Sequence, residues 1–231
     1  MNRRDLFKLI AGLYGLSNIS LFARETGILE QSNISNLDKL CFLGVGGGGT
    51  NILEDISKLN NIHRFIHVNS DYNSLKQKSS KYKLLLGWNE KAGLGCGGKE
   101  ECGRSLINNN VKSNLYKLTK DEKIVYVIST LGGGVGSGAT PEIVEYLKGL
   151  NKKVVVFATM PFGFEGNKRF SIAQNACEKI KIYADSLVIL KNDDLINNSK
   201  NKALGIRDTF QITSNNIYKK ISNEHFSNYA R

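Results

Sequence analysis

Residues 40–51 read Leu-Cys-Phe-Leu-Gly-Val-Gly-Gly-Gly-Gly-Thr-Asn, and this stretch decides the fold. The apolar run at 40–45 predicts a buried strand, and the glycines after it predict a tight turn into a helix. Glycine at this density lets the backbone approach a ligand closely and leaves N–H groups available to an anion. A helix expected from Asn51 adds its positive end to the same place. The stretch therefore predicts a phosphate-binding turn at the carboxyl end of a strand.

A second glycine-rich stretch has the same arrangement. Residues 129–138 read Ser-Thr-Leu-Gly-Gly-Gly-Val-Gly-Ser-Gly and follow the apolar run 124–128. Pro141 and Glu142 are typical of the opening turn of a helix, where proline needs no donor and an acid complements the dipole. Two such turns at one edge of a sheet predict a cradle for a polyphosphate.

Between and beyond these turns, short apolar runs alternate with longer helical patterns. Strands are expected at 40–45, 65–68, 124–128, 154–158 and 187–190, and helices at 51–59, 104–118, 141–150 and 170–183. Continuously apolar strands separated by helices indicate a doubly wound α/β fold, a mainly parallel sheet with helices on both faces. Ligands of such sheets bind at the carboxyl ends of the strands.

Two other nucleotide-binding patterns are present in part. Residues 44–49 satisfy GxGxxG and Asp71 lies where a dinucleotide fold has its ribose-binding acid, so an NAD(P)-dependent oxidoreductase stays a remote alternative. The second glycine loop argues against it, because a dinucleotide fold uses one glycine-rich turn for the pyrophosphate. Residues 93–99 match GxxxxGK, but Glu100 stands where a magnesium-binding Ser or Thr is required, so a P-loop is rejected.

The order of the motifs resembles a known family. Residues 39 to about 220 resemble the nucleotide-binding domain of the tubulin/FtsZ family, and FtsZ more than tubulin. Each motif is modest by itself, and the order of all of them is specific. The motifs are GVGGGGTN at 44–51, HVNSD at 67–71, the stretch 93–104, GGGVGSG at 132–138, MPFGFEGNKR at 160–169, DSL at 185–187 and KND at 191–193.

The resemblance implies GTP or GDP along the strand ends and leaves an accompanying Mg²⁺ open. The residues expected around the phosphates are Gly46, Gly47, Gly48, Gly49, Thr50 and Asn51 in the first loop, Gly97 and Gly98 in a third loop, and Gly132, Gly133, Gly134, Val135, Gly136, Ser137 and Gly138 in the second loop. No protein metal site is expected.

The same resemblance implies roles at the ribose and the base. It places Glu165 on the ribose, Arg169 on the ribose or the phosphates, and Asn192 on the guanine edge, while Phe210 stacks on the base and Asn215 takes the position of a guanine-reading acid. Two plainer interpretations stay open: Phe210 as a core aromatic residue, and Glu165 with Arg169 as a surface ion pair one helical turn apart.

Three positions depart from the family pattern. Val135 replaces a threonine that is usual in the phosphate loop, and residues 96–102 lack the usual Gly-Ala-Asn-Pro run, although Lys99 adds a positive charge there. Asn215 replaces an acid. An amide offers one carbonyl acceptor where a carboxylate has two oxygens, so selectivity for guanine over adenine is left open.

Hydrolysis in the family depends on a loop of form Asn-x-Asp-x-x-Asp that reaches the nucleotide of the next subunit, and a second domain follows it. The sequence ends at Arg231 with neither. Positioning and charge stabilisation are most of what phosphoryl transfer requires. We therefore expect a GTP-binding protein with weak or partner-dependent hydrolysis and no catalytic residues of its own. Self-association and co-assembly with a full-length FtsZ are both left open, and the alternative is a pseudo-GTPase that docks to a membrane or a partner.

The N-terminal residues are expected to be separate from the nucleotide-binding domain, which is expected at 39–231. Residues 1–23 carry paired Arg3 and Arg4 before an uncharged run, a pattern that resembles a twin-arginine export signal. The run is too short for a membrane span of about 20 residues, and an amphipathic helix on the domain or on a lipid surface is the other interpretation. Residues 24–38 are expected to be a linker. We expect a cytoplasmic protein, with membrane contact through residues 1–23 and export left open.

Composition adds limits of its own. The chain has 231 residues, 41% of them hydrophobic, so disordered and low-complexity classes are excluded. The net charge of +11 comes from 24 Lys and 8 Arg against 21 acids, and because lysine is common throughout the chain we expect no nucleic-acid partner. The cysteines form no CxxC pair, and the histidines complete no zinc-binding spacing, so we expect reduced thiols and no structural metal. The residues concerned are Cys41, Cys96, Cys102, Cys177, His63, His67 and His225.

Overall fold

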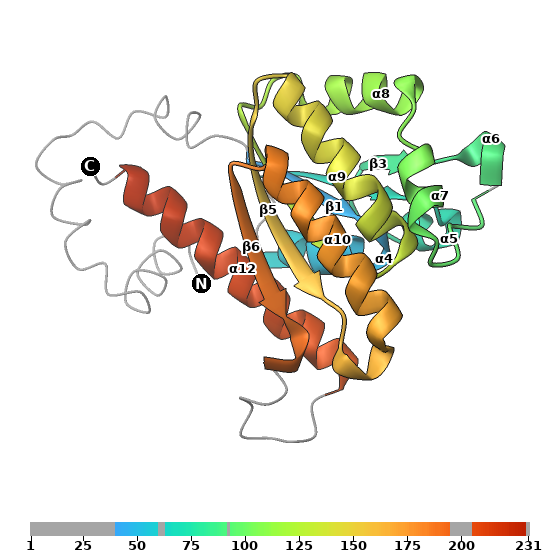
Figure 1. Cartoon of the computed structure of the whole chain (residues 1–231). Helices are drawn as coiled ribbons and strands as arrows, with labels where there is room; N and C mark the ends of the chain where they lie inside the picture. Colours follow the sequence, from blue (N-terminus) through green and yellow to red (C-terminus); the bar gives the residue numbers. More distant parts are fainter. Residues whose placement is uncertain (1–39, 60–62, 92, 195–204, 230–231) are drawn as a thin grey trace, which may run out of the picture. The chain divides into compact units, whose positions relative to one another are not determined.

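The computed structural model describes residues 40–59, 63–91, 93–194 and 205–229 (Figure 1). The chain divides into the unit Met1–Lys39 and the unit Leu40–Arg231, and all described residues belong to the second unit. The predictions made for residues 1–23 and 24–38 lie outside the described residues.

In the described part of the chain, six strands form one sheet in the order β3-β2-β1-β4-β5-β6, and every neighbouring pair is parallel. In register, Val45 at the end of β1 lies between Val68 and Ser129. The predicted doubly wound α/β fold is confirmed. The strands are β1 (Cys41–Val45), β2 (Arg64–Asn69), β3 (Tyr82–Leu85), β4 (Ile124–Thr130), β5 (Lys153–Met160) and β6 (Ser186–Lys191).

Helices cover both faces of this sheet (Figure 1). One face packs against α4 (Gly46–Leu59) and α12 (Ile206–Tyr229), and the other against α8 (Asn109–Thr119), α9 (Gly134–Gly149) and α10 (Asn167–Tyr183). The shorter elements are α5 (Tyr72–Lys76), α6 (Trp88–Lys91), α7 (Glu100–Ser105) and the 3-10 turn η1 (Gly163–Glu165).

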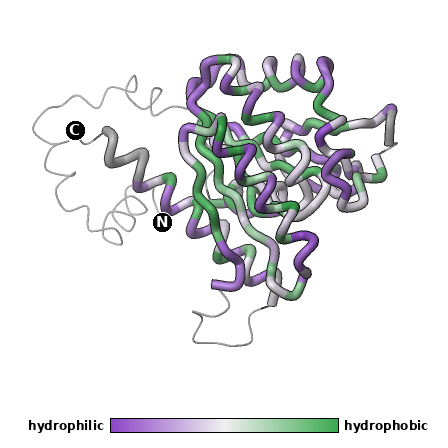
Figure 2. Tube along the Cα trace, viewed as in Figure 1, coloured by the Kyte–Doolittle hydropathy of each residue, from purple (hydrophilic) through white to green (hydrophobic). Residues whose placement is uncertain are grey.

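The strands are apolar on both sides because each side faces a separate core. In β1, Cys41 and Leu43 contribute to the core under α9 and α10, whereas Phe42 contributes to the core under α4 and α12. All five residues of β1 are buried, as expected for a central strand of a two-sided parallel sheet. Figure 2 shows the hydrophobic colour concentrated along the strands.

The helix expected at 104–118 is instead two helices, α7 and α8. The chain leaves the helical path at Leu106 and Ile107, whose side chains are buried in the core. Asn108 then caps α8, because its side-chain oxygen accepts a hydrogen bond of 3.1 Å from the Val111 N–H. The apolar spacing typical of a helix continued through this break, so the sequence pattern did not show that one helix ends and another begins at Asn108.

The prediction for Pro141 was wrong in position. The helix α9 begins at Gly134, so Pro141 is its eighth residue rather than a member of its opening turn. The glycines were treated as a loop, but they carry the first helical turn, and in the same way α4 begins at Gly46 rather than near Asn51.

The sequence also missed β3 and underestimated the lengths of β4 and β5. The strand β4 ends at the polar residue Thr130, and in β5 the polar residue Thr159 comes directly before the last residue, Met160. The apolar runs stopped before these residues, so strand extension brings hydroxyl groups to the carboxyl edge of the sheet.

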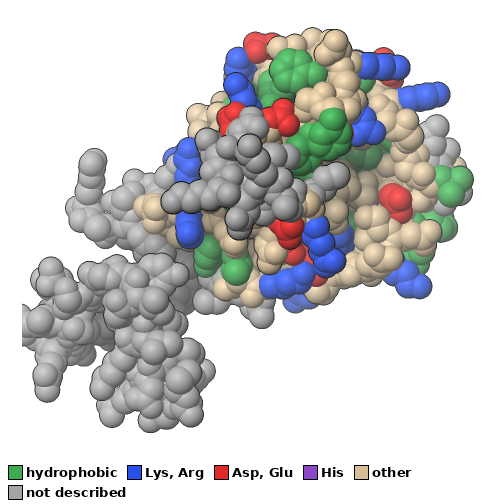
Figure 3. Space-filling model, turned by 90° about the horizontal axis from the view of Figure 1, so that it is seen from below, with side chains coloured by type: hydrophobic (Ala, Val, Ile, Leu, Met, Phe, Trp, Pro, Cys, Tyr) green, Lys and Arg blue, Asp and Glu red, His purple; other side chains and the backbone are tan. Residues whose placement is uncertain are grey.

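Figure 3 views the molecule from the edge at which β5 and β6 end. Lys and Arg side chains lie at several separate places on this face, with Asp and Glu among them. Within the described part of the chain, no helix is both long and apolar enough to cross a membrane.

Candidate functional site

A cleft of about 590 Å³ opens where the carboxyl ends of the strands meet the glycine loops. Residues that follow five of the six strands line it, and α12 contributes Phe210. The cleft therefore lies at the sheet edge where doubly wound folds bind ligands.

The first glycine loop brings the beginning of α4 to the cleft. Gly46 has a positive φ of 77°, and a Cβ there would lie 2.9 Å from the Gly136 nitrogen of α9. The two helix N-termini therefore meet at a glycine-to-glycine contact. Gly47 and Gly48 line the cleft beside this contact, and N–H groups in the first turn of a helix have no partner within the helix. Two positive helix ends thus face one cavity.

The second glycine loop is held by buried hydroxyl groups. The Ser137 Oγ accepts a hydrogen bond of 2.7 Å from the Gly132 N–H. The Ser129 hydroxyl donates to the Gly136 carbonyl at 3.2 Å and accepts from the Thr140 hydroxyl at 2.9 Å. Ser137 does not line the cleft, so in this structure its hydroxyl orders the loop while the backbone at Gly133 and Gly134 faces the cavity.

The third loop closes one side of the cleft with Gly95, Gly97 and Gly98. Its Cys96 forms a disulfide with Cys102, which corrects the expectation that all cysteines are reduced. The two residues match no common motif. The helix α7 turns the chain back after Glu100, so the two Cα atoms lie 5.6 Å apart, a distance typical of a disulfide. The remaining cysteines, Cys41 and Cys177, are buried and unpaired.

Asn192 directly follows the edge strand β6, lines the cleft and is 3% exposed. Its Nδ2 donates a hydrogen bond of 2.8 Å to the Met160 carbonyl, and its Oδ1 has no hydrogen-bond partner among the described residues. Phe210 is half-buried and also lines the cleft, with its ring 6.4 Å from that of Phe162. The cleft lining therefore combines an aromatic ring with an unsatisfied acceptor.

Ser70 and Thr159 also line the cleft, and the hydroxyl oxygen of each is buried without a hydrogen-bond partner among the described residues. Each residue is 1% exposed. Buried polar atoms in native proteins are nearly always hydrogen-bonded, so three unsatisfied atoms around one cavity fit a cavity that holds a polar ligand.

Glu165 at the end of η1 and Arg169 in α10 form an ion pair. The Arg169 guanidinium donates to Glu165 Oε2, and Glu165 Oε1 accepts a hydrogen bond of 2.9 Å from the Phe162 N–H. The Arg169 side chain is 54% exposed, and it is the only positively charged side chain among the described residues that line the cleft. The ion pair and the position at the cleft are thus both present, so the surface-pair interpretation does not exclude a ligand contact.

The structure brings most of the predicted site residues to the cleft. Those that line it are Gly47, Gly48, Asn51, Gly97, Gly98, Gly133, Gly134, Val135, Gly136, Glu165, Arg169, Asn192 and Phe210.

The other predicted residues lie behind the cleft or away from it. Gly46, Gly49, Gly132 and Gly138 support the loops through close backbone contacts. Thr50 is buried and donates through its hydroxyl to the Gly47 carbonyl at 2.8 Å.

Asn215 is exposed on α12 and does not line the cleft. In an α-helix, the residue on the same face as Phe210 one turn later is Ser214, not Asn215. Ser214 is buried and donates through its hydroxyl to the Phe210 carbonyl at 2.8 Å.

Sequence reasoning missed the contribution of the end of β2. Asn69, Ser70 and Asp71 all line the cleft. The Asp71 carboxylate also caps α5, because it accepts a hydrogen bond of 2.8 Å from the Ser74 N–H. The motif at 67–71 supported the family resemblance, but no site role was assigned to it except that of Asp71 in the dinucleotide alternative. Its position at the end of the strand next to β1 was the available signal.

The sequence model of the Tubulin/FtsZ family, GTPase domain, matches residues 39–200. The chain belongs to the Tubulin/FtsZ family. The matched region contains both glycine loops, the third loop and Asn192, whereas α12 with Phe210 follows it.

Curated members of this family include close matches in sequence. The cell division protein FtsZ of Buchnera aphidicola (subspecies Baizongia pistaciae) is 32% identical over 194 residues, which are 83% of this chain and 49% of that protein. The FtsZ of Helicobacter pylori is 32% identical over 168 residues, 71% of this chain and 43% of that protein. The chain thus spans about half the length of the curated relatives it matches.

Solved structures of the Tubulin/FtsZ family share the fold. An empty FtsZ dimer from M. jannaschii superposes with a TM-score of 0.73 at 23% identity, over 85% of this chain and 59% of that one. CetZ2 from Haloferax volcanii, described as a GTPγS-bound protofilament, gives a TM-score of 0.72 at 21% identity, over 81% of this chain and 58% of that one. At these identities the likeness concerns the fold.

Proposed function

We propose that the chain binds GTP and GDP in this cleft, with the phosphates at the N-termini of α4 and α9 and the base between Asn192 and Phe210. The observation that carries the proposal is the cleft itself, in which two helix N-termini follow the adjacent strands β1 and β4, and a buried acceptor with no partner among the described residues follows the edge strand β6. A nucleotide combines an anionic end with a polar, stackable end, so it fits both.

The phosphate end supplies N–H groups rather than cations. Gly47 and Gly133 each face open space, so no side chain blocks the backbone there. Val135 lines the cleft with an apolar side chain where the family usually has a hydroxyl group, so the backbone N–H groups carry the binding at that position. Arg169 adds one positive charge at the rim.

The base end favours guanine. Guanine presents its ring N–H and its amino group side by side as donors, whereas adenine presents a ring acceptor next to its amino group. The Asn192 Oδ1 is an acceptor, and its amide orientation is fixed because Nδ2 donates to the Met160 carbonyl. An acceptor held in this way pairs with guanine donors and opposes the adenine ring nitrogen.

An accompanying Mg²⁺ would find one suitable carboxylate in the cleft. Asp71 and Glu165 are the acids that line it among the described residues. Glu165 already accepts from Arg169 and from the Phe162 N–H, so Asp71 is the acid that we assign to the metal ion. Carboxylate oxygens together with nucleotide phosphates are the usual ligands of Mg²⁺.

We further propose that hydrolysis is weak unless a partner contributes to the site. Glu165 is held in its ion pair, and Asp71 caps α5 through one carboxylate oxygen and is the acid that we assign to Mg²⁺, so neither is placed as a base for an attacking water. Self-association or co-assembly with a full-length FtsZ would supply the missing group. The description of CetZ2 as a protofilament supports assembly as a property of related proteins.

Calorimetric titration of the full chain with GTP, GDP, ATP and NADH tests the binding proposal. We expect saturable binding of GTP and GDP, weaker binding of ATP and none of NADH. Absence of binding by either guanine nucleotide would overturn the proposal.

A pair of variants on one helix supplies the control. Gly133→Glu places a carboxylate at the N-terminus of α9, where it suits the helix dipole but repels phosphates, and a Cβ there meets no atom within 4 Å. Gly149→Glu makes the same change at the other end of α9, also in open space and outside the cleft. We expect the first variant to abolish GTP binding and the second to retain it.

A further inference from the structure

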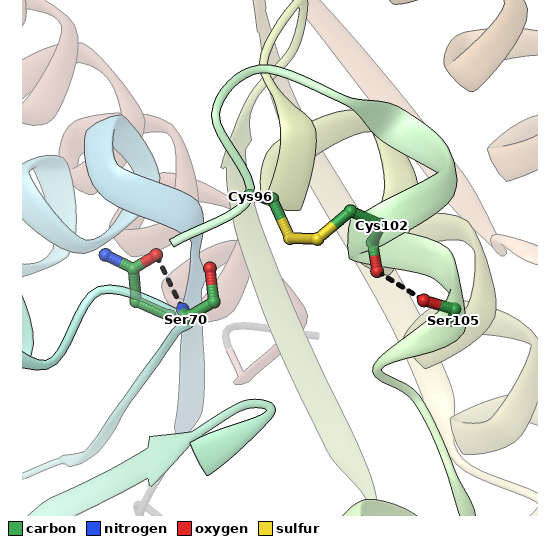
Figure 4. Close-up of a disulfide and its surroundings, with 5 residues drawn as sticks. Ser70, Cys96, Cys102 and Ser105 are labelled. Carbon is green, nitrogen blue, oxygen red and sulfur yellow. Dashed lines mark hydrogen bonds between the residues drawn. A yellow bond between two sulfur atoms is a disulfide. The ribbon is translucent and has the colours of Figure 1, made fainter. Parts of the chain in front are cut away.

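The disulfide between Cys96 and Cys102 connects the wall of the cleft to the helix α7 (Figure 4). Cys96 lines the cleft, whereas Cys102 lies in α7, is half-buried and does not line it. Between the two cysteines lie Gly97 and Gly98, which also line the cleft. The covalent bond therefore closes a short ring whose glycines form part of the proposed nucleotide site.

This loop has few other anchors. Among residues 94–99, all of them described, Cys96 carries the single buried side chain, and Leu94 is 85% exposed. Gly95, Gly97 and Gly98 have φ values of 80°, 54° and 78°. Glycine loses more conformational freedom on ordering than any other residue, so a loop of this composition needs an external constraint to hold one shape.

Three backbone hydrogen bonds contribute to that constraint: from the Gly95 N–H to the Ser70 carbonyl at 3.1 Å, from the Lys99 N–H to the Cys96 carbonyl at 3.0 Å, and from the Gly103 N–H of α7 to the Lys99 carbonyl at 3.4 Å. The second bond lies inside the ring that the disulfide closes, so it does not tie the loop to another element. The disulfide is the covalent part of the attachment.

The helix at the other end of the disulfide is fixed to the phosphate-binding helix. A Cβ on Gly103 of α7 would lie 2.2 Å from the Gly134 carbonyl oxygen, and one on Gly138 of α9 would lie 2.0 Å from the Glu100 carbonyl oxygen. These backbones are thus in direct contact. Cys96 itself lies against α9, since a Cβ on Gly134 would meet the Cys96 Cβ at 2.8 Å. The disulfide therefore holds the third loop against the N-terminus of α9.

We propose that Cys96 and Cys102 form a reversible thiol–disulfide exchange site that sets the nucleotide affinity of the cleft. With the disulfide formed, the third loop is held in its binding shape. With the disulfide reduced, Gly97 and Gly98 lose their constraint, and binding must first order the loop, so affinity falls. The inference rests on the proposed nucleotide binding.

The exchange partner is a dithiol reductant. One of its thiolates attacks a sulfur of the disulfide, the Sγ–Sγ bond breaks and a mixed disulfide forms. The second thiol of the reductant then displaces the protein sulfur. Two electrons and two protons pass to the protein, which ends with two thiols, while the reductant ends as a cyclic disulfide.

Linkage makes the effect reciprocal. If reduction weakens GTP binding by a given factor, GTP must oppose reduction by the same factor. Coupling between sites in proteins is typically about 5–150-fold, and we expect about tenfold here.

The first measurement is the number of thiols in protein purified without reductant and then denatured. Two reactive thiols are expected, from Cys41 and Cys177, rising to four after treatment with dithiothreitol. Four thiols before treatment would overturn the proposal.

The second measurement is the Kd for GTP of the full chain before and after dithiothreitol. We expect about tenfold weaker binding after reduction. Cys102→Ser opens the disulfide without altering a cleft residue, so it should bind GTP weakly with or without reductant. Cys177→Ala removes a buried thiol outside the cleft and should keep the response of the wild-type protein.

The outcomes separate the two proposals. Equal GTP affinity of the oxidised and reduced forms overturns the exchange site and leaves nucleotide binding intact, whereas no binding by either form overturns the proposed function. As a control, a thermal unfolding scan of the reduced wild-type protein is used to check that it is folded at the assay temperature. Saturating GTP should also raise the dithiothreitol concentration needed for half reduction, and an unchanged midpoint would contradict the coupling.

Discussion

Only one end of the Asn192 amide is hydrogen-bonded among the described residues. Its Nδ2 donates to the Met160 carbonyl, and its Oδ1 has no partner there although the residue is buried. An unmet hydrogen bond on a buried group costs about 1–3 kcal/mol, so a ligand that donates to Oδ1 recovers free energy that an apolar ligand does not. Asn192 is therefore the side chain on which base selectivity depends.

Replacing Asn192 tests this assignment directly. For Asn192→Ala we expect the GTP Kd to rise about tenfold, equivalent to about 1.4 kcal/mol, while weak ATP binding changes little. Asn215→Ala is the matched control, because the family pattern points to Asn215 but the structure exposes it away from the cleft. A loss of GTP affinity in the Asn215 variant, with Asn192→Ala unaffected, would reverse the assignment. Titration calorimetry measures both.

His67 predicts a pH dependence of stability. Its side chain is fully buried in β2. Burial lowers its pKa to about 4; Glu54, whose carboxylate lies 3.5 Å from Nε2, opposes this shift, and Lys78 and Lys83 add to it. The unfolded chain binds a proton near pH 6.5, whereas the folded chain does not until about pH 4. Stability is therefore fully present above pH 6.5 and falls as the pH is lowered towards 4.

The free energy of unfolding should be about 2 kcal/mol smaller at pH 5 than at pH 7 because of this group. Urea unfolding at the two pH values measures the difference. His67→Gln removes the titrating ring, so its own difference between the two pH values should be smaller by that amount, whatever its stability at pH 7. An identical pH dependence in the two proteins would show that His67 does not carry it.

The helix α9 contains glycines that differ in the space available for a side chain. A Cβ on Gly136 would lie 2.0 Å from the Thr130 carbonyl oxygen, so Gly136→Ala must push α9 away from β4. Overpacking of this kind costs about 1–3 kcal/mol. Gly149 has open space around it, so Gly149→Ala should stabilise the protein by up to about 1 kcal/mol by restricting the unfolded chain. Denaturant unfolding measures both, and stabilisation by Gly136→Ala would contradict the close approach.

These glycines also mark what the sequence could and could not predict. The two glycine loops, the parallel sheet and the edge that carries the cleft all followed from local composition and periodicity. Which glycines face a ligand could not be predicted, because Gly47 and Gly133 border open space while Gly138 is packed against the Glu100 backbone of α7. That distinction depends on how α7 and α9 meet in space.

Two other differences have separate physical causes. The periodicity of α12 places Ser214 on the same face as Phe210. The sequence alone could therefore have shown that Asn215 is on a different face from Phe210 and is poorly placed to contact the same base. The disulfide could not be predicted, because Cys96 and Cys102 approach each other only where α7 reverses the chain after Glu100.

For the whole described domain, the cleft joins parts of the chain from Gly47 to Phe210, contributed by the ends of five strands and by α12. A ligand held by all of them stabilises the folded state as a unit. At a GTP concentration 100 times its Kd the expected stabilisation is about 2.7 kcal/mol, which corresponds to a rise in Tm of about 5–10 °C for a chain of this size. Hydrogen exchange should slow in residues 94–98, 133–136 and 206–213 together and change little in α8, which contributes nothing to the cleft lining. A rise of equal size with ATP, or protection confined to one of the three segments, would show that the nucleotide does not bridge the cleft from the glycine loops to α12.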